Sequence, residues 1–492
     1  MQNVQLSVKR FKESPHLQLA AVLLASLIIY FLVFLLPANL LNLYDQPRLD
    51  RDLLFYQGPA AYIRLALAFI GVWILYWIGY RISLKIQGRN GWIIIITGML
   101  AIIAVLLFMA PFDAADIYDN IIHGRILGVY DANPFQQVIA DYPDDPFYEY
   151  AAWKNVPSAY GPVWEILAGI TARLIGNGII ANVMAFKILP GIFHLAGVVV
   201  IVLYLRRETP EKSLSGAFLL GLNPMILYET WGHGHNDMAM AFWFLVAAWF
   251  IYNQRFTLAS LALLVGALIK FIPILLIPGV LILAWRNLES MRLRFLFIVR
   301  TGILSLLAIV ATYYPFGAGF GSLTLERRMQ MFSTSIPASL YHLLIPTLGK
   351  SEAARLVSLG ALMVLTVFVL YQSFRKVEKK PSDHFIQTTF NILAFYLMVT
   401  CLWFQQWYSL WLLCLVPLLS RDNRHIALFF GFWLLNKQLV FSPIFIPTIH
   451  FLPETAIRLV PLYTLVNLGV PLIFMILILI RRRMRKQSHA QQ

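Results

Sequence analysis

The chain has 492 residues, of which 59% are hydrophobic and only 13% are charged. Soluble domains typically carry about 25% charged residues, so this composition excludes an ordinary soluble protein and indicates a membrane protein. The net charge of +15 does not indicate a nucleic-acid-binding protein, because the basic residues lie in short clusters between apolar runs. Lipid hydrocarbon offers the backbone no hydrogen-bond partners, so the apolar runs are predicted to be helices.

The number of predicted helices follows from the apolar runs and the basic clusters between them. A helix needs roughly 20 apolar residues to cross the hydrocarbon, and basic clusters favour the cytoplasmic side. Placing every basic cluster on the cytoplasmic side predicts a single all-α polytopic domain over 1–492. This domain is predicted to have about 14 transmembrane helices (12–14, since several are short), with both termini cytoplasmic. The predicted spans are 17–37, 60–80, 92–111, 184–205, 214–230, 237–252, 257–270, 272–285, 296–316, 352–374, 385–403, 407–420, 425–441 and 458–480.

This register leaves two long segments outside the membrane. Residues 160–176 have a helical pattern, but a crossing there would move Arg206 and Arg207 outside, so we interpret them as an interfacial or re-entrant helix. The first external loop is therefore predicted at 112–183 and the second at 317–351. The cytoplasmic connections are short and the sequence has no Walker-type loop, which places the chemistry on the outer face.

The first external loop is acidic. Between positions 113 and 154 its carboxylates are Asp113, Asp116, Asp119, Asp131, Asp141, Asp144, Asp145 and Glu149. The first three directly follow a predicted helix at a spacing of three residues, which places them on one stripe if the helix continues. Such a cluster suits a general base or a divalent-cation site, with Mg²⁺ or Mn²⁺ as the candidate ion. A solvated polar loop at the headgroups is the alternative.

A second polar group occupies the predicted external turn at 231–237. It contains His233, His235, Asn236 and Asp237, and its glycines leave the backbone open to the approach of a ligand. His233 and Asp237 are four residues apart and are expected to share a helical face. A zinc site of the His-x-His type lacks a third clear protein ligand. We therefore predict substrate contacts here, with an ordinary polar turn as the alternative.

Several cations are predicted at the outer ends of helices, on the side that the positive-inside rule depletes. They are Lys270, Arg64, Lys187, Lys437 and Arg458, and the second external loop adds Arg327 and Arg328. Charges near membrane depth are costly and are usually retained for use, and these suit a phosphate group. Snorkelling to the headgroups is the alternative for any one of them.

Two further segments have less specific patterns. Residues 317–321 mimic a dinucleotide-binding loop, but they follow a transmembrane helix instead of joining a strand to a helix, so we interpret them as a flexible loop. The aromatic turn at 403–408 includes Trp407 and Tyr408, which either stack on a sugar or belong to the interfacial aromatic belt.

Four short blocks in order resemble the polyprenol-phosphate-mannose-dependent mannosyltransferases of the GT-C superfold. The first block comprises Asp116-Ile117-Tyr118, Gly124-Arg125, Asn133-Pro134-Phe135 and Tyr160-Gly161-Pro162-Val163-Trp164, and the second comprises Asn223-Pro224 with His235-Asn236-Asp237. The third is Lys270 before Pro273, and the fourth is Gln406-Trp407-Tyr408-Ser409-Leu410-Trp411. Gln405-Gln406 departs from the His-Pro usual in that family. The blocks cover residues 113–411 and do not specify the sugar or the acceptor.

The resemblance implies an inverting transfer of a hexose, mannose by the family pattern, from a polyprenyl-phosphate sugar to a glycan or glycolipid. By the same pattern Asp116 is the base that deprotonates the acceptor hydroxyl, and Asp113 is the next candidate. Cationic side chains or a metal stabilise the leaving phosphate, and Asp119, Arg125 and Tyr160 contact substrate. The implied location is the inner cell membrane, with the site outside and the donor chain in the bilayer.

A lipid or small-molecule transporter, including a flippase, is the competing class. It would also be helical and carry intramembrane charges. Transporters typically show an internal repeat and broken helices in matching halves, and the sequence has no such repeat. The polar residues also gather at one face instead of the midplane, which favours glycosyl transfer.

Overall fold

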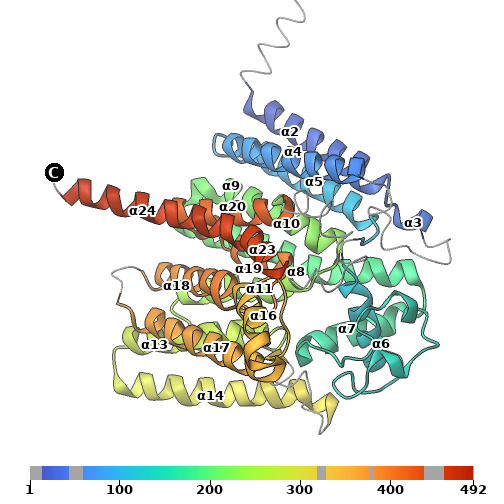
Figure 1. Cartoon of the computed structure of the whole chain (residues 1–492). Helices are drawn as coiled ribbons and strands as arrows, with labels where there is room; N and C mark the ends of the chain where they lie inside the picture. Colours follow the sequence, from blue (N-terminus) through green and yellow to red (C-terminus); the bar gives the residue numbers. More distant parts are fainter. Residues whose placement is uncertain are drawn as a thin grey trace, which may run out of the picture. The chain divides into compact units, whose positions relative to one another are not determined.

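The computed structural model describes residues 14–43, 59–112, 114–317, 328–376, 380–436 and 459–490. Helices dominate this part of the chain (Figure 1). The described residues contain no β-strand, and their single β-bridge is an isolated pairing of Asn39 with Met109. The prediction of an all-α protein is therefore confirmed for these ranges.

The chain divides into two compact units. Unit 1 comprises Met1–Ala132, Ile139–Asn155 and Leu167–Phe242, and unit 2 comprises Asn133–Val138, Val156–Ile166 and Trp243–Gln492. The segment predicted as the first external loop, 112–183, therefore contributes residues to both units.

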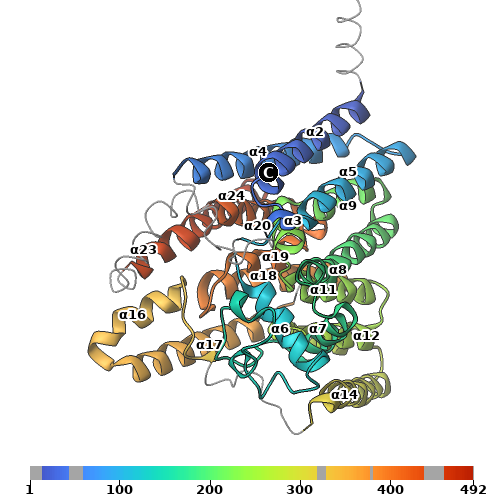
Figure 2. The ribbon, with the colours of Figure 1, turned by 90° about the vertical axis from the view of Figure 1, so that its right-hand side faces the viewer.

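Unit 1 contains three long apolar helices, α2, α4 and α5, that pack side by side (Figures 1 and 2). Helix α8 packs against the short α9 and against α6, which begins the predicted external loop. The helices are α2 (Pro15–Ile29), α3 (Leu40–Leu43), α4 (Pro59–Ser83), α5 (Arg89–Leu107), α6 (Asp116–Gly128), α8 (Ile179–Glu208), α9 (Ser213–Gly221) and α10 (Pro224–Leu227). Shorter π and 3₁₀ segments are Tyr30–Leu35, Ile139–Asp141, Tyr148–Tyr150, Pro210–Lys212 and Tyr228–Gly232. Helices α7 (Pro162–Ile175) and α11 (Asp237–Tyr252) have residues in both units.

Two glycines let α6 approach α7 within unit 1. A β-carbon on Gly128 would lie 2.0 Å from the carbonyl oxygen of Gly169, and one on Gly124 would lie 2.7 Å from that of Ala168. Because a backbone atom cannot move aside as a flexible side chain can, neither position accommodates a larger residue. This close packing fixes α6, the helix that begins with Asp116.

Unit 2 contains the remaining helices. Helix α13 packs against α12, α17 and α18, while α16 and α17 form a hairpin (Figure 2) and α20 packs against α24. The helices are α12 (Phe256–Ala267), α13 (Ile277–Asn287), α14 (Met291–Tyr313), α16 (Ile336–Leu348), α17 (Lys350–Phe374), α18 (Pro381–Phe395), α19 (Leu410–Leu413), α20 (Arg421–Asn436), α23 (Val460–Thr464) and α24 (Val470–Ala490). Shorter π and 3₁₀ segments are Ile272–Leu276, Tyr314–Phe316, Tyr396–Thr400, Gln406–Ser409, Val416–Leu418 and Leu465–Gly469.

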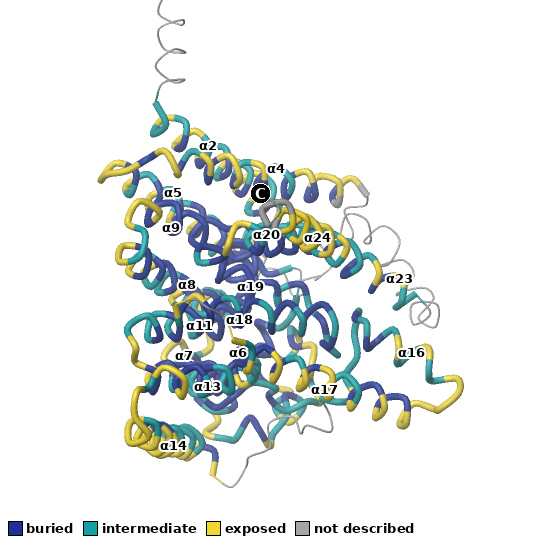
Figure 3. The backbone as a smooth tube through the Cα atoms, turned by 90° about the vertical axis from the view of Figure 1, so that its left-hand side faces the viewer, coloured by how far each residue is buried: buried dark blue, intermediate teal, exposed yellow. Residues whose placement is uncertain are grey.

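Among the described residues, 7 helical segments are long and apolar enough to cross a membrane. They are Pro15–Leu35, Ile63–Ser83, Arg89–Leu107, Ile179–Glu208, Met291–Phe316, Lys350–Phe374 and Val460–Arg485. Other predicted spans fall on shorter or broken helices, so the count of about 14 stays a prediction. Figure 3 shows α14 largely exposed, and its apolar side chains include Phe295 and Leu306, as expected of a lipid-facing helix.

Candidate functional site

Asp116 is the first residue of α6. The exposed amide groups of a helix N-terminus carry a partial positive charge, which stabilises a carboxylate at this position. The side chain of Asp116 is 24% exposed, so it is partly open to solvent. The predicted stripe that joins Asp113 to Asp116 stays a prediction, because Asp113 does not belong to the described residues.

His235 lies between Asp116 and a second carboxylate, Glu229. Its Nε2 is 4.0 Å from Asp116 Oδ2, and its Nδ1 is 2.9 Å from Glu229 Oε2. The side chain of Glu229 is fully buried, and that of His235 is nearly so. A buried imidazole with a carboxylate on each side can hold a proton next to Asp116 and can orient its carboxylate. We call Asp116, His235 and Glu229 the Asp116 cluster; all three belong to unit 1.

The turn that carries His235 depends on Gly234. This glycine has φ +71°, and a β-carbon there would lie 2.6 Å from Ile117 Cδ1 and 3.2 Å from the carbonyl oxygen of Phe186. The turn therefore lies directly against the first turn of α6. The expected shared helical face of His233 and Asp237 is wrong, because α11 begins at Asp237 and His233 lies in the preceding turn.

Replacing Gly234 by alanine is expected to lower both stability and transfer. The positive φ costs a side-chain-bearing residue about 1–2 kcal/mol, and the added carbon would push the turn, with His235, away from α6. Thermal unfolding and turnover of the purified protein measure the two effects. Gly349 has a similar φ of +76° with no atom within 4 Å of an added carbon, so Gly349→Ala should lose stability only. Wild-type turnover in Gly234→Ala would contradict the role of the close approach.

The other residues of the turn are also buried. His233, Asn236 and Asp237 are each almost completely inaccessible, and His233 Nδ1 lies 3.1 Å from the carbonyl oxygen of Tyr228. Of the predicted turn residues, the structure places His235 close to Asp116, while direct substrate contact by the other three stays a prediction.

Asp119, the next carboxylate on α6, holds the chain of the same loop. Its Oδ1 accepts hydrogen bonds from the amide groups of Ala152 at 2.9 Å and Trp153 at 3.1 Å. Asp119 is also buried. These contacts favour a structural role over the substrate contact expected from the sequence.

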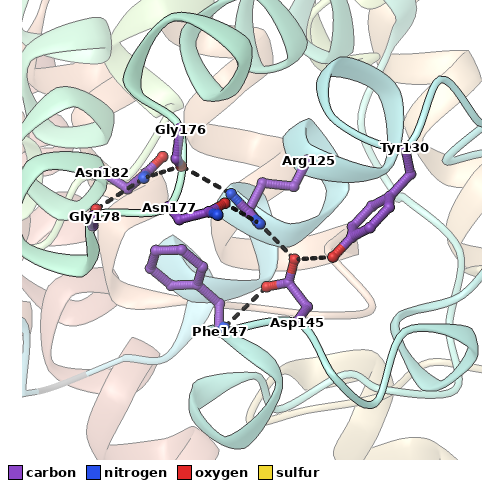
Figure 4. A network of polar contacts seen from close by, with 8 residues as sticks. All are labelled: Arg125, Tyr130, Asp145, Phe147, Gly176, Asn177, Gly178 and Asn182. Atoms are coloured by element: carbon purple, nitrogen blue, oxygen red, sulfur yellow. Dashed lines mark hydrogen bonds and ion pairs between the residues drawn. The ribbon is translucent and has the colours of Figure 1, made fainter.

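Arg125 lies at the centre of a buried polar network (Figure 4). Its Nε is 2.6 Å from Asp145 Oδ2, its Nη1 donates to the carbonyl oxygen of Gly176 at 2.8 Å, and its Nη2 donates to Asn177 at 3.0 Å. The hydroxyl of Tyr130 donates to the same carboxylate at 2.8 Å. With each guanidinium nitrogen engaged inside unit 1, we propose that Arg125 fixes the loop and does not bind substrate.

Lys187 has a similar structural placement. Its side chain is fully buried in α8 and donates to the carbonyl oxygens of Leu106 and Met109, with Leu107 at 3.4 Å. Carbonyls at a helix C-terminus lack intrahelical partners and carry partial negative charge, which favours a cation there. We therefore propose that Lys187 caps α5, in place of the phosphate contact expected from the sequence.

In unit 2, aromatic rings surround the ammonium group of Lys270. Its Nζ lies 4.7 Å from the ring centroid of Tyr408, 5.6 Å from that of Trp411 and 5.7 Å from that of Tyr160. Cation–π attraction within about 6 Å holds the cation in place without neutralising its charge. We call these four residues the Lys270 cage. Because an anion brought to the cage meets a positioned positive charge, this geometry suits a phosphate.

Arg328 belongs to the same unit. Its guanidinium lies 4.6 Å from the ring centroid of Phe271, the neighbour of Lys270, and donates to the carbonyl oxygen of Ala159, the neighbour of Tyr160. Burial lowers the pKa of Arg328, while the nearby Tyr408 opposes that shift.

The remaining predicted cations and aromatic residues lie in different settings. Arg64 is exposed on α4, and Trp407 is half-buried, beside Tyr408 at 6.3 Å between ring centroids. Arg327, Lys437 and Arg458 lie outside the described residues. Phosphate binding by these cations therefore stays a prediction.

Glu229 and Trp411 were not predicted from the sequence as individual site residues. Glu229 is an acid inside the predicted span 214–230, and an ionisable residue within an apolar run is a functional signal that could have identified it. Trp411 lies three residues after Tyr408, and the two rings stack at 4.5 Å. That spacing places both on one side of a helical turn.

A resident metal has no ready set of ligands in the described part of the chain. No group of three or more His, Cys, Asp or Glu residues there is arranged to hold an ion. The suggestion of Mg²⁺ or Mn²⁺ concerns a cluster that includes Asp113, which is outside that part, and it stays a hypothesis.

A family model described as "Alpha-(1->6)-mannopyranosyltransferase, N-terminal domain" matches residues 23–286, more than half of the chain. Searches of curated proteins and of solved structures gave no match. The matched range contains the Asp116 cluster and Lys270, whereas Arg328 and Tyr408 follow it.

Proposed function

The chain belongs to the alpha-(1->6)-mannopyranosyltransferase family, and from this premise we propose that it transfers mannose from a polyprenyl phosphate to a glycan or glycolipid outside the cell membrane. Family membership establishes a mannosyl-transferring enzyme. The lipid-phosphate donor and the external site are our proposal, supported by the membrane-length helices and by the absence of a Walker-type loop from the sequence.

The observation that carries the chemistry is the Asp116 cluster. We propose that Asp116 accepts the proton of the acceptor hydroxyl while the hydroxyl oxygen attacks the anomeric carbon of mannose. The bond between that carbon and the phosphate oxygen breaks, and the electron pair leaves with the polyprenyl phosphate. His235, between Glu229 and Asp116, orients the base and stabilises its charge. Forming an α-linkage with inversion requires a β-linked donor.

The Lys270 cage is the proposed contact for the donor phosphate. The phosphate of the donor already carries a negative charge before transfer, and a fixed cation there binds that charge in the ground state as well as in the transition state. The aromatic rings hold the ammonium group without supplying a carboxylate that would compete with the phosphate. Arg328 is the second proposed ligand, because it contacts Phe271 and Ala159, which flank two residues of the cage.

One experiment tests the proposed sugar and donor together. Membranes containing the protein are given radiolabelled polyprenyl-phosphate-mannose or the glucose analogue, and the glycan and glycolipid products are profiled. We expect mannosylated products from the first donor and background labelling from the second. Equal labelling from both would contradict the sugar assignment, and labelling from neither would contradict the lipid-phosphate donor.

The proposed topology has its own expected result. Asp141→Cys should react with an impermeant maleimide added to intact cells, and Lys379→Cys should react only after the membrane is opened. The background for both variants lacks Cys401 and Cys414, which are buried. Labelling of position 379 but not of position 141 in intact cells would overturn both the topology and the external site.

A further inference from the structure

A buried glutamate in unit 2 is not explained by the proposed catalytic or donor contacts. Glu165 lies in the first turn of α7 and has no accessible surface. Its Oε1 accepts a hydrogen bond from the hydroxyl of Ser158, which is also fully buried. Oε2 has no hydrogen-bond partner among the described residues. Burying a carboxyl group is costly, so its presence at this position calls for a function.

The Ser158 hydroxyl connects Glu165 to the Lys270 cage. Besides donating to Glu165, Ser158 Oγ accepts a hydrogen bond from the amide of Tyr160 at 3.2 Å. Tyr160 is the cage residue whose ring faces the Lys270 ammonium at 5.7 Å. One hydroxyl therefore joins a buried carboxyl to the backbone of a cage residue.

The other side of Tyr160 is fixed to the chain just before Lys270. The amide of Gly161 donates to the carbonyl oxygen of Ile269 at 2.9 Å, and the amide of Val163 donates to that of Leu268 at 3.0 Å. A β-carbon on Gly161 would lie 2.2 Å from the Leu268 carbonyl oxygen, so only glycine allows this approach. The backbone is thus secured on one side of Tyr160 by main-chain contacts and on the other by Ser158.

We propose that Glu165 is a positioning residue of the donor site, which acts through Ser158 to hold Tyr160 against the Lys270 ammonium. This inference rests on the proposed role of Lys270 in donor binding. Burial raises the pKa of Glu165 to about 7. In either protonation state Oε1 retains a lone pair for the Ser158 hydroxyl, so an amide oxygen can replace it. An apolar side chain of similar length cannot.

The test measures the donor KM, acceptor KM and kcat of the purified full chain with polyprenyl-phosphate-mannose. Glu165→Met should raise donor KM about fivefold, the loss expected for one buried hydrogen bond, with acceptor KM and kcat within about twofold. Glu165→Gln should stay within about twofold of wild type in donor KM. Glu352→Met, which removes an exposed carboxylate from α17 in the same unit, is the matched control and should change none of the three.

A double variant separates positioning from a general effect on folding. In the Lys270→Met background, Glu165→Met should add no further rise in donor KM, because the ammonium that it positions is gone. Independent, multiplying effects of the two changes would overturn the proposal, as would a wild-type donor KM in Glu165→Met. If Glu165→Met does not fold, Ser158→Ala removes the same hydrogen bond together with the one from the Tyr160 amide, and its donor KM is judged by the same criteria.

The result also separates this inference from the function on which it rests. A raised donor KM in Lys270→Met with a normal one in Glu165→Met rejects the positioning role alone. A normal donor KM in Lys270→Met rejects the donor site, and the positioning role with it.

Discussion

Replacing Asp116 by asparagine is expected to lower mannosyl transfer by about 10²- to 10⁴-fold, the usual contribution of a general base. An amide cannot accept the proton of the acceptor hydroxyl, although it keeps the size of the side chain and its place at the start of α6. Because the proton moves in the transition state, kcat should fall while the donor KM changes little. Turnover of the purified variant, with thermal unfolding as a check on folding, measures this.

Asp144→Asn is the matched control for this prediction. Asp144 is an exposed carboxylate of the same predicted loop, so its loss changes the loop charge equally and should leave turnover unchanged. Glu229→Gln should have a smaller effect than Asp116→Asn, because it acts only through His235. Full activity in Asp116→Asn would remove this residue from the mechanism and make Asp113 the next candidate.

Replacing Lys270 by methionine is expected to raise the donor KM about ten- to a hundredfold, the loss of one charge-assisted contact worth about 1.5–3 kcal/mol. Methionine keeps an apolar stem among the rings of Tyr160, Tyr408 and Trp411, so the packing is largely preserved. The acceptor KM should barely change, because the acceptor does not use this charge. Initial rates at varied donor concentration measure the effect.

Lys350→Met removes an exposed lysine at the start of α17 and controls for a general loss of surface charge. Its donor KM should match that of the wild type. A donor KM within about twofold of wild type in Lys270→Met would mean that Lys270 only snorkels to the headgroups and does not bind the donor phosphate. Arg327 and Arg328 would then become the leading phosphate ligands.

The sequence allowed the helical class and much of the candidate site to be predicted, because both depend on local patterns. Apolar run length predicts helices in a medium without hydrogen-bond partners. The turn with His235 and the lysine before Pro273 were identified from residue type and position. The structure places His235 beside Asp116 and places Lys270 beside Tyr160 and Tyr408.

The roles of individual cations could not be predicted, because they depend on contacts between residues far apart in the sequence. Arg125 and Lys187 carry the same charge as Lys270. In the structure, however, Arg125 forms an ion pair with Asp145, and Lys187 donates to carbonyl oxygens at the end of α5. Glu165 is an acid within the helical pattern 160–176, but its contact with Ser158 could not be predicted, because Ser158 lies in the preceding loop. The sequence of a short helix such as Ser213–Gly221 likewise does not indicate whether that helix crosses the membrane by itself.

The central claim, mannosyl transfer from a lipid phosphate, is tested most directly by a product balance. Purified protein in proteoliposomes receives polyprenyl-phosphate-mannose labelled in the sugar, together with a mannose-terminated glycan acceptor. We expect one polyprenyl phosphate for each mannose transferred, a new α-(1→6) linkage in the product, and loss of both in Asp116→Asn. Labelled donor that crosses the bilayer unchanged, with no labelled acceptor, would identify a transporter and contradict mannosyl transfer from a lipid phosphate.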